Sequence, residues 1–293
     1  MQNRERSARG SANEDNMLTE TFSSIATAVR RVFANWPALL LVAIVYVALL
    51  VTLYFFVAVR EASIAQVTLT FALALAAPIL FFLLQTMIAN GFSDSVQPVN
   101  AGLLAKRSLT NFWKVMVITL PVIALAILLI YLLAKYQSQL AAVPDSATQL
   151  HPMAASSRTH ETARAPINWK GAALSTVRYL ALGLVLPLAA IHLWLATARD
   201  GLIAAIKRTG QLLARAFAPQ SVLIYAVGFL IFAVVPYFLL FRTTPNKHAW
   251  LDLILLGIRV ALVFALTLLG WVITVKAIAL LDKSPEPVSK EAA

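Results

Sequence analysis

Six long apolar stretches recur along the chain, and polar segments separate each from the next. They cover residues 37–59, 67–88, 115–134, 172–198, 219–241 and 253–275. The hydrocarbon core of a bilayer is about 30 Å thick and a helix rises about 1.5 Å per residue, so about 20 apolar residues cross it. The pattern therefore predicts an all-α protein, a polytopic transmembrane helix bundle with six spans, in a membrane domain of residues 18–281.

The segments at the two ends and one long internal segment are polar and lack periodicity. We expect disorder at the N-terminus (1–17), in an outer loop (137–168) and in the C-terminal tail (282–293). The polar start of the chain does not have the pattern of a cleavable signal peptide. The first span is therefore expected to act as an uncleaved anchor.

The composition is that of a membrane-embedded chain. Apolar residues make up 60% of it and charged residues 13%, whereas soluble domains are about half apolar and about a quarter charged. A water-soluble globular enzyme is therefore excluded. The chain has no cysteine, which excludes disulfides, thiolate catalysis and cysteine-ligated metals. The net charge of +11 is explained by membrane topology and anionic lipid better than by nucleic acid.

The distribution of Lys and Arg orients the predicted spans. If the N-terminus is cytosolic, the inner segments hold about twice as many Lys and Arg as the outer ones, as the positive-inside rule requires. We therefore predict a multi-pass protein of the bacterial inner membrane with both termini in the cytosol. All six tryptophans fall at predicted membrane edges, where headgroups suit their rings. They are Trp36, Trp113, Trp194 and Trp271 at the inner edge, and Trp169 and Trp250 at the outer edge.

A basic segment precedes each odd-numbered span. Its apolar residues recur every three or four positions, which predicts basic amphipathic helices in the cytoplasmic interface, with Asn100 and Asp200 as N-caps. The first two segments read RRVFANW and KRSLTNFW. This likeness suggests a threefold parallel repeat of one helix and two spans, but ordinary inside-to-outside topology also explains it. The candidate inner-leaflet lipid contacts are Arg30, Arg31, Lys106, Arg107, Lys207 and Arg208.

Few ionisable residues fall inside the predicted spans, and these are the candidates for a functional site. Arg178 and Arg259 lie in the outer halves of their spans and could together hold an anion such as a lipid headgroup. Snorkelling to the outer headgroups, or pairing of Arg259 with Asp252, also explains them. His192 is better explained by packing than by metal binding, because no residue at metal-ligand spacing accompanies it.

The sequence offers no set of residues for catalysis. No span carries a deep carboxylate, and the motifs HExxH, GxSxG and Walker A are absent. We therefore predict no catalytic residue, no cofactor and no metal. Four spans contain an interior proline, which suits either a hinge or ordinary bundle packing. These are Pro78, Pro121, Pro187 and Pro236.

Three stretches carry a family resemblance: RRVFANW followed by PALLLV, KRSLTNFWKVMVITLP, and IKRTGQLLARAFAPQSVLIY. This layout resembles a group of bacterial six-helix membrane proteins that includes the membrane domain attached to some glycerophosphodiester phosphodiesterases. The resemblance covers residues 20–281 as a pattern. It implies a six-span membrane fold and brings no catalytic residue with it.

These observations favour a non-enzymatic membrane protein that serves as a scaffold, an assembly partner or a lipid-interacting module. Its expected partners are membrane lipids, above all those of the anionic inner leaflet, and other proteins in the membrane, but not nucleic acid. The alternative is a permease-like carrier or lipid transporter, with proline-broken spans along a path and Arg178 and Arg259 as an anionic-headgroup site. An intramembrane enzyme has no supporting residues.

Overall fold

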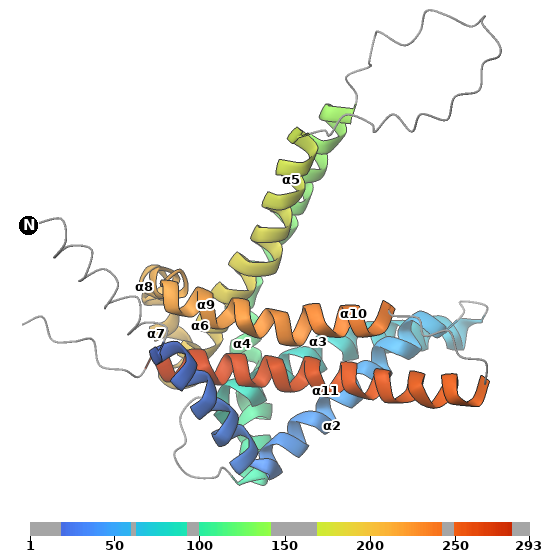
Figure 1. The fold of residues 1–293 in the computed structure, drawn as a ribbon, viewed down its shortest axis with the longest axis horizontal. Coiled ribbons are helices and arrows are strands. Elements are labelled where there is room, and N and C mark those ends of the chain that lie inside the picture. Colours follow the sequence, from blue (N-terminus) through green and yellow to red (C-terminus); the bar gives the residue numbers. More distant parts are fainter. Residues whose placement is uncertain (1–18, 60–62, 93–99, 142–168, 242–248, 283–293) are drawn as a thin grey trace, which may run out of the picture. The chain divides into compact units, whose positions relative to one another are not determined.

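The computed structural model describes residues 19–59, 63–92, 100–141, 169–241 and 249–282 (Figure 1). Within these ranges the chain forms helices and no strand, so the predicted all-α class is confirmed. The predicted disordered segments lie almost entirely outside the described residues. A first helix covers residues 19–34. It is followed by α2 (Trp36–Ala58), α3 (Ile64–Phe92), α4 (Ala101–Ala141), α5 (Trp169–Leu180), η1 (Ala181–Val185), α6 (Leu186–Asp200), α7 (Leu202–Lys207), α8 (Thr209–Ala216), α9 (Pro219–Phe229), η2 (Leu230–Val234), α10 (Val235–Phe241) and α11 (Ala249–Leu281).

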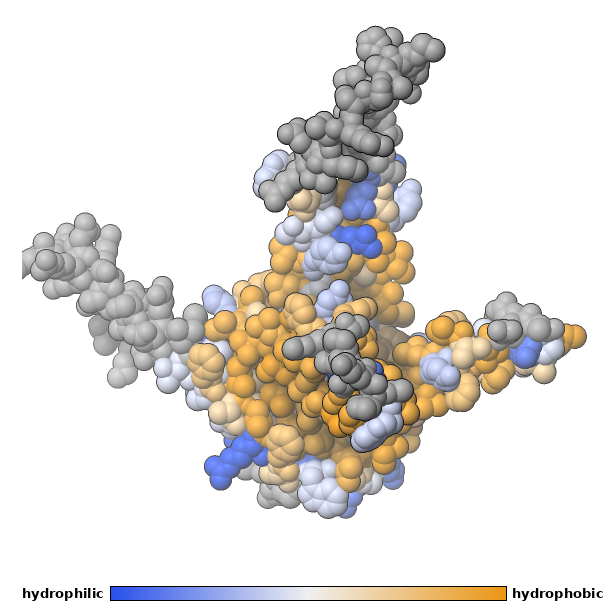
Figure 2. All heavy atoms as spheres, turned by 45° about the vertical axis from the view of Figure 1, so that its right-hand side comes forward, coloured by the Kyte–Doolittle hydropathy of each residue, from blue (hydrophilic) through white to orange (hydrophobic). Residues whose placement is uncertain are grey.

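Six of the described helical stretches are long and apolar enough to cross a membrane, as the sequence predicted. They are Trp36–Ala58, Ile64–Phe92, Ala101–Gln137, Gly171–Asp200, Pro219–Phe241 and Trp250–Leu281. Several extend beyond the predicted apolar windows, because backbone hydrogen bonding continues a helix into polar flanks. On the face that Figure 2 shows, hydrophobic side chains cover the helices and hydrophilic ones gather toward helix ends.

The chain divides into two compact units. The first comprises Met1–Thr119 and Leu188–Ala293, and the second comprises Leu120–Pro187. In the first unit α2 packs on α3, and α11 packs along α9, η2 and α10 and also contacts α3 (Figure 1). The second half of α4, with α5 and η1, makes up the described part of the second unit.

The three basic segments take three different forms. The first is the separate helix of residues 19–34, which ends in a turn at Asn35. The second is continuous with α4, so the prediction of a separate short helix is wrong there. The third is divided between α7 and α8. Asn100 caps α4, since its side-chain oxygen accepts a 2.9 Å hydrogen bond from the Gly102 N–H. Asp200 is not a cap, because Gly201 occupies the N-cap position of α7.

Two of the four interior prolines follow a π-helical turn. The segments η1 and η2 each end two residues before a proline, Pro187 and Pro236 respectively. Proline has no N–H and its ring crowds the carbonyl four residues earlier, so an ordinary helical turn is unfavourable there. A π turn widens the helix and shifts its hydrogen bonds by one residue. In membranes such adjustments satisfy the carbonyl groups that proline leaves free.

In the core of the first unit, aromatic rings pack against one another and form hydrogen bonds with polar side chains. The rings of Phe81 and Trp194, and those of Trp194 and Trp271, lie with centroids 6.4 Å apart. The Trp194 indole donates a 2.7 Å hydrogen bond to the Thr119 hydroxyl, and the Trp271 indole donates one of 3.0 Å to the Gln85 carbonyl. The prediction that these two tryptophans face headgroups is wrong for Trp194, which is only 6% exposed. Both rings contribute to helix packing.

Candidate functional site

The six predicted inner-leaflet contacts are accessible in the structure. Five of them are exposed, and Arg31 is half-buried. All lie in the first unit: on the helix before α2, near the start of α4, and at the end of α7 and its junction with α8. The exposed members are Arg30, Lys106, Arg107, Lys207 and Arg208. A basic side chain must be accessible to contact a lipid headgroup, and these six side chains meet that condition.

The two arginines proposed as an outer anion site lie in different units. Arg178 is exposed on α5 in the second unit, and Arg259 is half-buried on α11 in the first. The structure therefore does not test whether they form one site. Their convergence on an anion stays a prediction.

An amphipathic groove lies between α4 and α7. Its cavity has a volume of about 530 Å³ and is walled mainly by Trp113, Leu202, Ile203 and Ala204 with Lys114 and Lys207. The Lys114 ammonium lies 5.9 Å from the centre of the Trp113 ring, within cation–π range. The groove thus combines apolar walls with two cationic side chains and one carboxylate, that of Asp200, which leaves one positive charge in excess. Lys207 is one of the residues that the sequence singled out.

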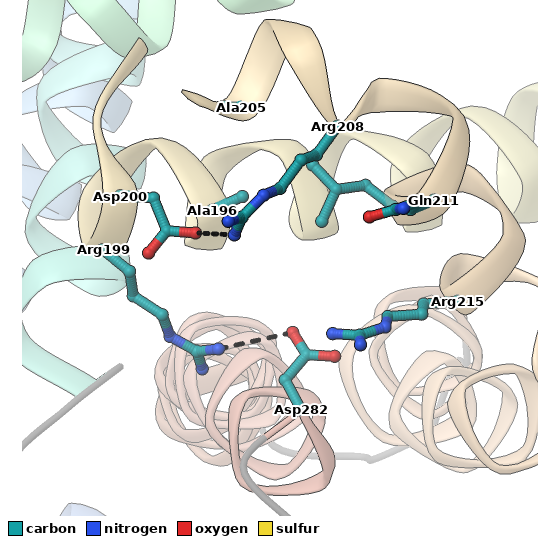
Figure 3. Close-up of a pocket in the computed structure, with 9 residues that line it drawn as sticks. Ala196, Arg199, Asp200, Ala205, Arg208, Gln211, Arg215 and Asp282 are labelled. Carbon is teal, nitrogen blue, oxygen red and sulfur yellow. Dashed lines mark hydrogen bonds and ion pairs between the residues drawn. The ribbon is translucent and has the colours of Figure 1, made fainter. Parts of the chain in front are cut away.

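A second, smaller cavity lies where the ends of α6 and α11 meet α7 and α8. Its volume is about 100 Å³. Three arginines and two aspartates line it, and we call it the arginine cavity. Its charged residues are Arg199, Asp200, Arg208, Arg215 and Asp282, and Gln211 adds an amide. In Figure 3 the guanidinium groups of Arg199 and Arg215 approach Asp282 from opposite sides, and that of Arg208 extends toward Asp200.

A glycine turn builds the arginine cavity. Gly201 has φ +86°, the only positive φ of a glycine in the described ranges. This conformation is easy for glycine and strained for other residues, so it lets the chain leave α6 and reverse into α7. Arg208 then follows α7, and Arg215 comes seven residues later, which is about two helical turns and the same side of α8.

The ion pairs of the arginine cavity are long. Arg208 Nη1 lies 3.3 Å from Asp200 Oδ2, and Arg199 Nη1 lies 3.6 Å from Asp282 Oδ2. Hydrogen bonds between a guanidinium and a carboxylate are usually about 2.7–2.9 Å. The shortest contact of Arg199 is instead a 2.8 Å hydrogen bond from Nη2 to the Ala279 carbonyl, which ties α6 to α11. The carboxylates therefore hold the guanidinium groups loosely.

Buried polar groups without a protein partner lie beside the arginine cavity. Neither ring nitrogen of His192 forms a hydrogen bond within the described part of the chain, although the residue is only 1% exposed. Its Nδ1 is 3.7 Å from Asp282 Oδ2. The Nε of Arg199 is likewise buried without an acceptor among the described residues. Buried donors and acceptors normally have a partner, whether protein, water or ligand.

The charges of this cavity favour an anion. Its three guanidinium groups outnumber its two carboxylates, so one positive charge is in excess. In the ranges that the structure describes, no three His, Asp or Glu side chains gather as a metal site would need. The packing prediction for His192 is confirmed by its burial on α6.

Sequence reasoning missed this cavity. Arg199 and Arg215 entered only the count of inner positive charges, and Asp282 was assigned to the tail, although it follows α11 directly and lies beside Arg199. One signal was available: the Asp200–Gly201 pair, which suggests a reversal of the chain after a span. It would have placed Arg208 and Arg215 near Arg199, but not near Asp282.

Comparison with known proteins adds no assignment. No family model, no curated protein and no solved structure matches this chain. The resemblance to the membrane domains attached to glycerophosphodiester phosphodiesterases therefore stays a prediction.

Proposed function

We propose that this chain is a non-enzymatic integral protein of the bacterial inner membrane that binds anionic phospholipid of the inner leaflet. Its termini lie in the cytosol, and it acts as a lipid-organising or scaffolding module. The observation that carries the proposal is the groove between α4 and α7, whose apolar walls carry Lys114 and Lys207. A phospholipid has the same combination, an apolar body with an anionic head.

The groove suits a lipid at the membrane edge. Trp113 is 47% exposed, and a tryptophan ring prefers the headgroup layer. Each lysine near an anionic surface contributes about 1 kcal/mol. Ile203 is 71% exposed beside Lys207, so an acyl chain has apolar surface to follow next to the charge. The exposed basic residues on the neighbouring segments would add a more general attraction for anionic headgroups.

Quenching of tryptophan fluorescence by brominated lipids tests this proposal. The full chain is reconstituted with brominated phosphatidylglycerol or with brominated phosphatidylcholine. The difference between the wild type and Trp113→Phe isolates the contribution of Trp113. We expect stronger quenching by the anionic lipid, and we expect Lys114→Gln/Lys207→Gln to lose a preference of about thirtyfold, because two such lysines contribute about 2 kcal/mol of binding free energy.

The matched control is Lys135→Gln/Arg164→Gln, which removes the same charge from the second unit. It should leave the quenching of Trp113 unchanged. Basic residues also set topology, so each variant carries a C-terminal reporter that reports the side of the membrane. Equal quenching of wild-type Trp113 by the two lipids would refute the proposal, and a C-terminal reporter outside the cytosol would refute its orientation.

A further inference from the structure

We propose that the arginine cavity binds a terminal phosphate group, carried either by a phospholipid or by a soluble phosphomonoester. This inference goes beyond the lipid groove. It rests on different side chains, with Asp200 alone lining both cavities. It would stand if the groove bound no lipid.

The size of the cavity selects the kind of ligand. Its volume of about 100 Å³ is about a fifth of the 530 Å³ of the groove between α4 and α7. One tetrahedral oxyanion occupies a space of this order, whereas a nucleotide or a sugar does not. A phosphodiester would have to pass two substituents out of the cavity. A terminal phosphate passes only one.

The donors are those that recognise phosphate. Arg199 comes from α6, Arg208 from the junction of α7 and α8, and Arg215 from α8, so three guanidinium groups reach one space from separate segments. A guanidinium presents its N–H groups as a planar fork that matches two phosphate oxygens. Three such forks from different directions suit the oxygens of a tetrahedral group better than a flat carboxylate.

The existing contacts leave these donors available. Among the described residues, no carboxylate lies within salt-bridge distance of Arg215. Arg208 makes one 3.3 Å contact with Asp200, and Nη1 of Arg199 lies 3.6 Å from Asp282. A phosphate oxygen can therefore bind without displacing a short hydrogen bond.

The two aspartates limit what can bind. Asp200 and Asp282 offset two of the three positive charges, so the cavity has a single excess charge and does not attract every anion strongly. Selectivity must then come from hydrogen-bond geometry, which favours a ligand that fills the cavity and meets several guanidinium groups. This separates the arginine cavity from the exposed basic residues, which attract anions by charge alone.

Native mass spectrometry of the full chain in detergent tests the inference with three probes. These are dioleoyl phosphatidic acid, which has a terminal phosphate; dioleoyl phosphatidylglycerol, an anionic diester; and inorganic phosphate as a competitor. We expect phosphatidic acid to bind about tenfold more tightly than phosphatidylglycerol, and inorganic phosphate to compete. Arg215→Gln should weaken phosphatidic acid binding about tenfold, the usual effect of losing a hydrogen bond to a charged group.

Matched variants separate recognition from charge and from misfolding. Lys135→Gln removes one exposed positive charge from the second unit, outside the cavity, and should leave the affinity unchanged. Arg215→Lys keeps the charge but loses the fork, so its affinity should fall between those of the wild type and Arg215→Gln. If Arg215→Gln does not fold, Arg208→Gln is the second cavity variant.

The two sources of the phosphate group give different results. Binding of phosphatidic acid that depends on Arg215 supports a lipid source. Binding of inorganic phosphate with the same dependence, but no binding of phosphatidic acid, supports a soluble phosphomonoester. The inference is overturned if neither probe binds the wild type, if phosphatidylglycerol binds as tightly as phosphatidic acid, or if Lys135→Gln loses as much affinity as Arg215→Gln.

Discussion

The fourth span consists of two halves with opposite surroundings. In α5, before the π turn, no described side chain from Gly171 to Leu180 is buried. In α6, after Pro187, every side chain from Leu188 to Thr197 is buried. The most apolar window of this span is 61% buried, while no other span exceeds 22%. Half of the span is therefore a central helix of the first unit, and the other half is an outer surface of the second.

This difference shows that apolar character alone does not decide what a membrane helix contacts. Lipid tails and protein interiors are equally apolar, so a buried half and an exposed half have similar hydropathy. Their polar residues differ in use. Arg178 in α5 is exposed, whereas the Trp194 indole in α6 donates a hydrogen bond to Thr119 on α4. Substitutions in the two halves should therefore have very different costs.

The largest difference is expected for a leucine in each half. Leu188 is 0% exposed and Leu180 is 52% exposed. Leu188→Ala leaves a cavity in a packed helix and should lower the free energy of unfolding by about 2 kcal/mol, the low end of the range for buried leucine. The low end applies because an unfolded span stays in lipid and regains much of the transfer energy. Leu180→Ala should change it by less than about 0.5 kcal/mol.

Reversible unfolding by SDS in mixed micelles measures both variants against the wild type. The comparison between the two halves of the span fails if the two alanine variants shift the midpoint equally.

Two glycine-to-alanine substitutions test the contrast between packed and exposed helix surfaces by adding a methyl group instead of removing side-chain atoms. A Cβ at Gly228 would overlap the Thr274 side chain, while a Cβ at Gly183 would meet no described atom within 4 Å. Rotation of the Thr274 hydroxyl does not relieve the overlap, because its Cβ is also too close. Gly228→Ala should therefore push α9 away from α11 and lower the free energy of unfolding by about 1–3 kcal/mol. Alanine favours a helix by about 1 kcal/mol over glycine, so Gly183→Ala should be neutral or stabilising.

The thermal stability of the two variants in detergent can be compared by measuring how much monodisperse protein remains after heating. This measurement is sufficient to show which variant is the more stable. Gly270→Ala is a second test of the packed face, since its Cβ would lie 2.8 Å from the Phe232 Cβ. A Gly228→Ala protein as stable as the wild type would mean that α9 and α11 are not held as closely as the structure describes.

The spans could be predicted from the sequence because each segment's own length and hydropathy determine whether it can cross a membrane. Length and hydropathy are local properties, so all six spans were found. The arginine cavity depends on which segments meet, and local periodicity contains no such information. Arg199 and Asp282 are more than 80 positions apart and meet only because α6 and α11 pack together. The misassignment of Trp194 has the same cause, since a ring at a span edge can face either headgroups or a neighbouring helix.

The smallest change in stability that we predict comes from a single hydrogen bond in the core of the first unit. The Trp194 indole donates to the Thr119 hydroxyl, which itself donates to the Val115 carbonyl at 2.5 Å. Trp194→Phe leaves that hydroxyl with its own backbone acceptor, whereas Thr119→Val leaves the buried indole N–H without one. The loss of the hydrogen bond should therefore lower the free energy of unfolding more in Thr119→Val than in Trp194→Phe.

A double-mutant cycle with Trp194→Phe and Thr119→Val gives the coupling free energy of this pair. We expect about 0.6 kcal/mol, the average for interhelical hydrogen bonds in a bilayer protein, and no more than about 1.7 kcal/mol. Trp113→Phe is the control for loss of an indole, because its ring is 47% exposed and its removal should cost less than about 0.5 kcal/mol. A coupling of zero would mean that ring packing alone holds Trp194. The edge-on contacts with Phe81 and Trp271 would then account for the burial of α6 without any polar contribution.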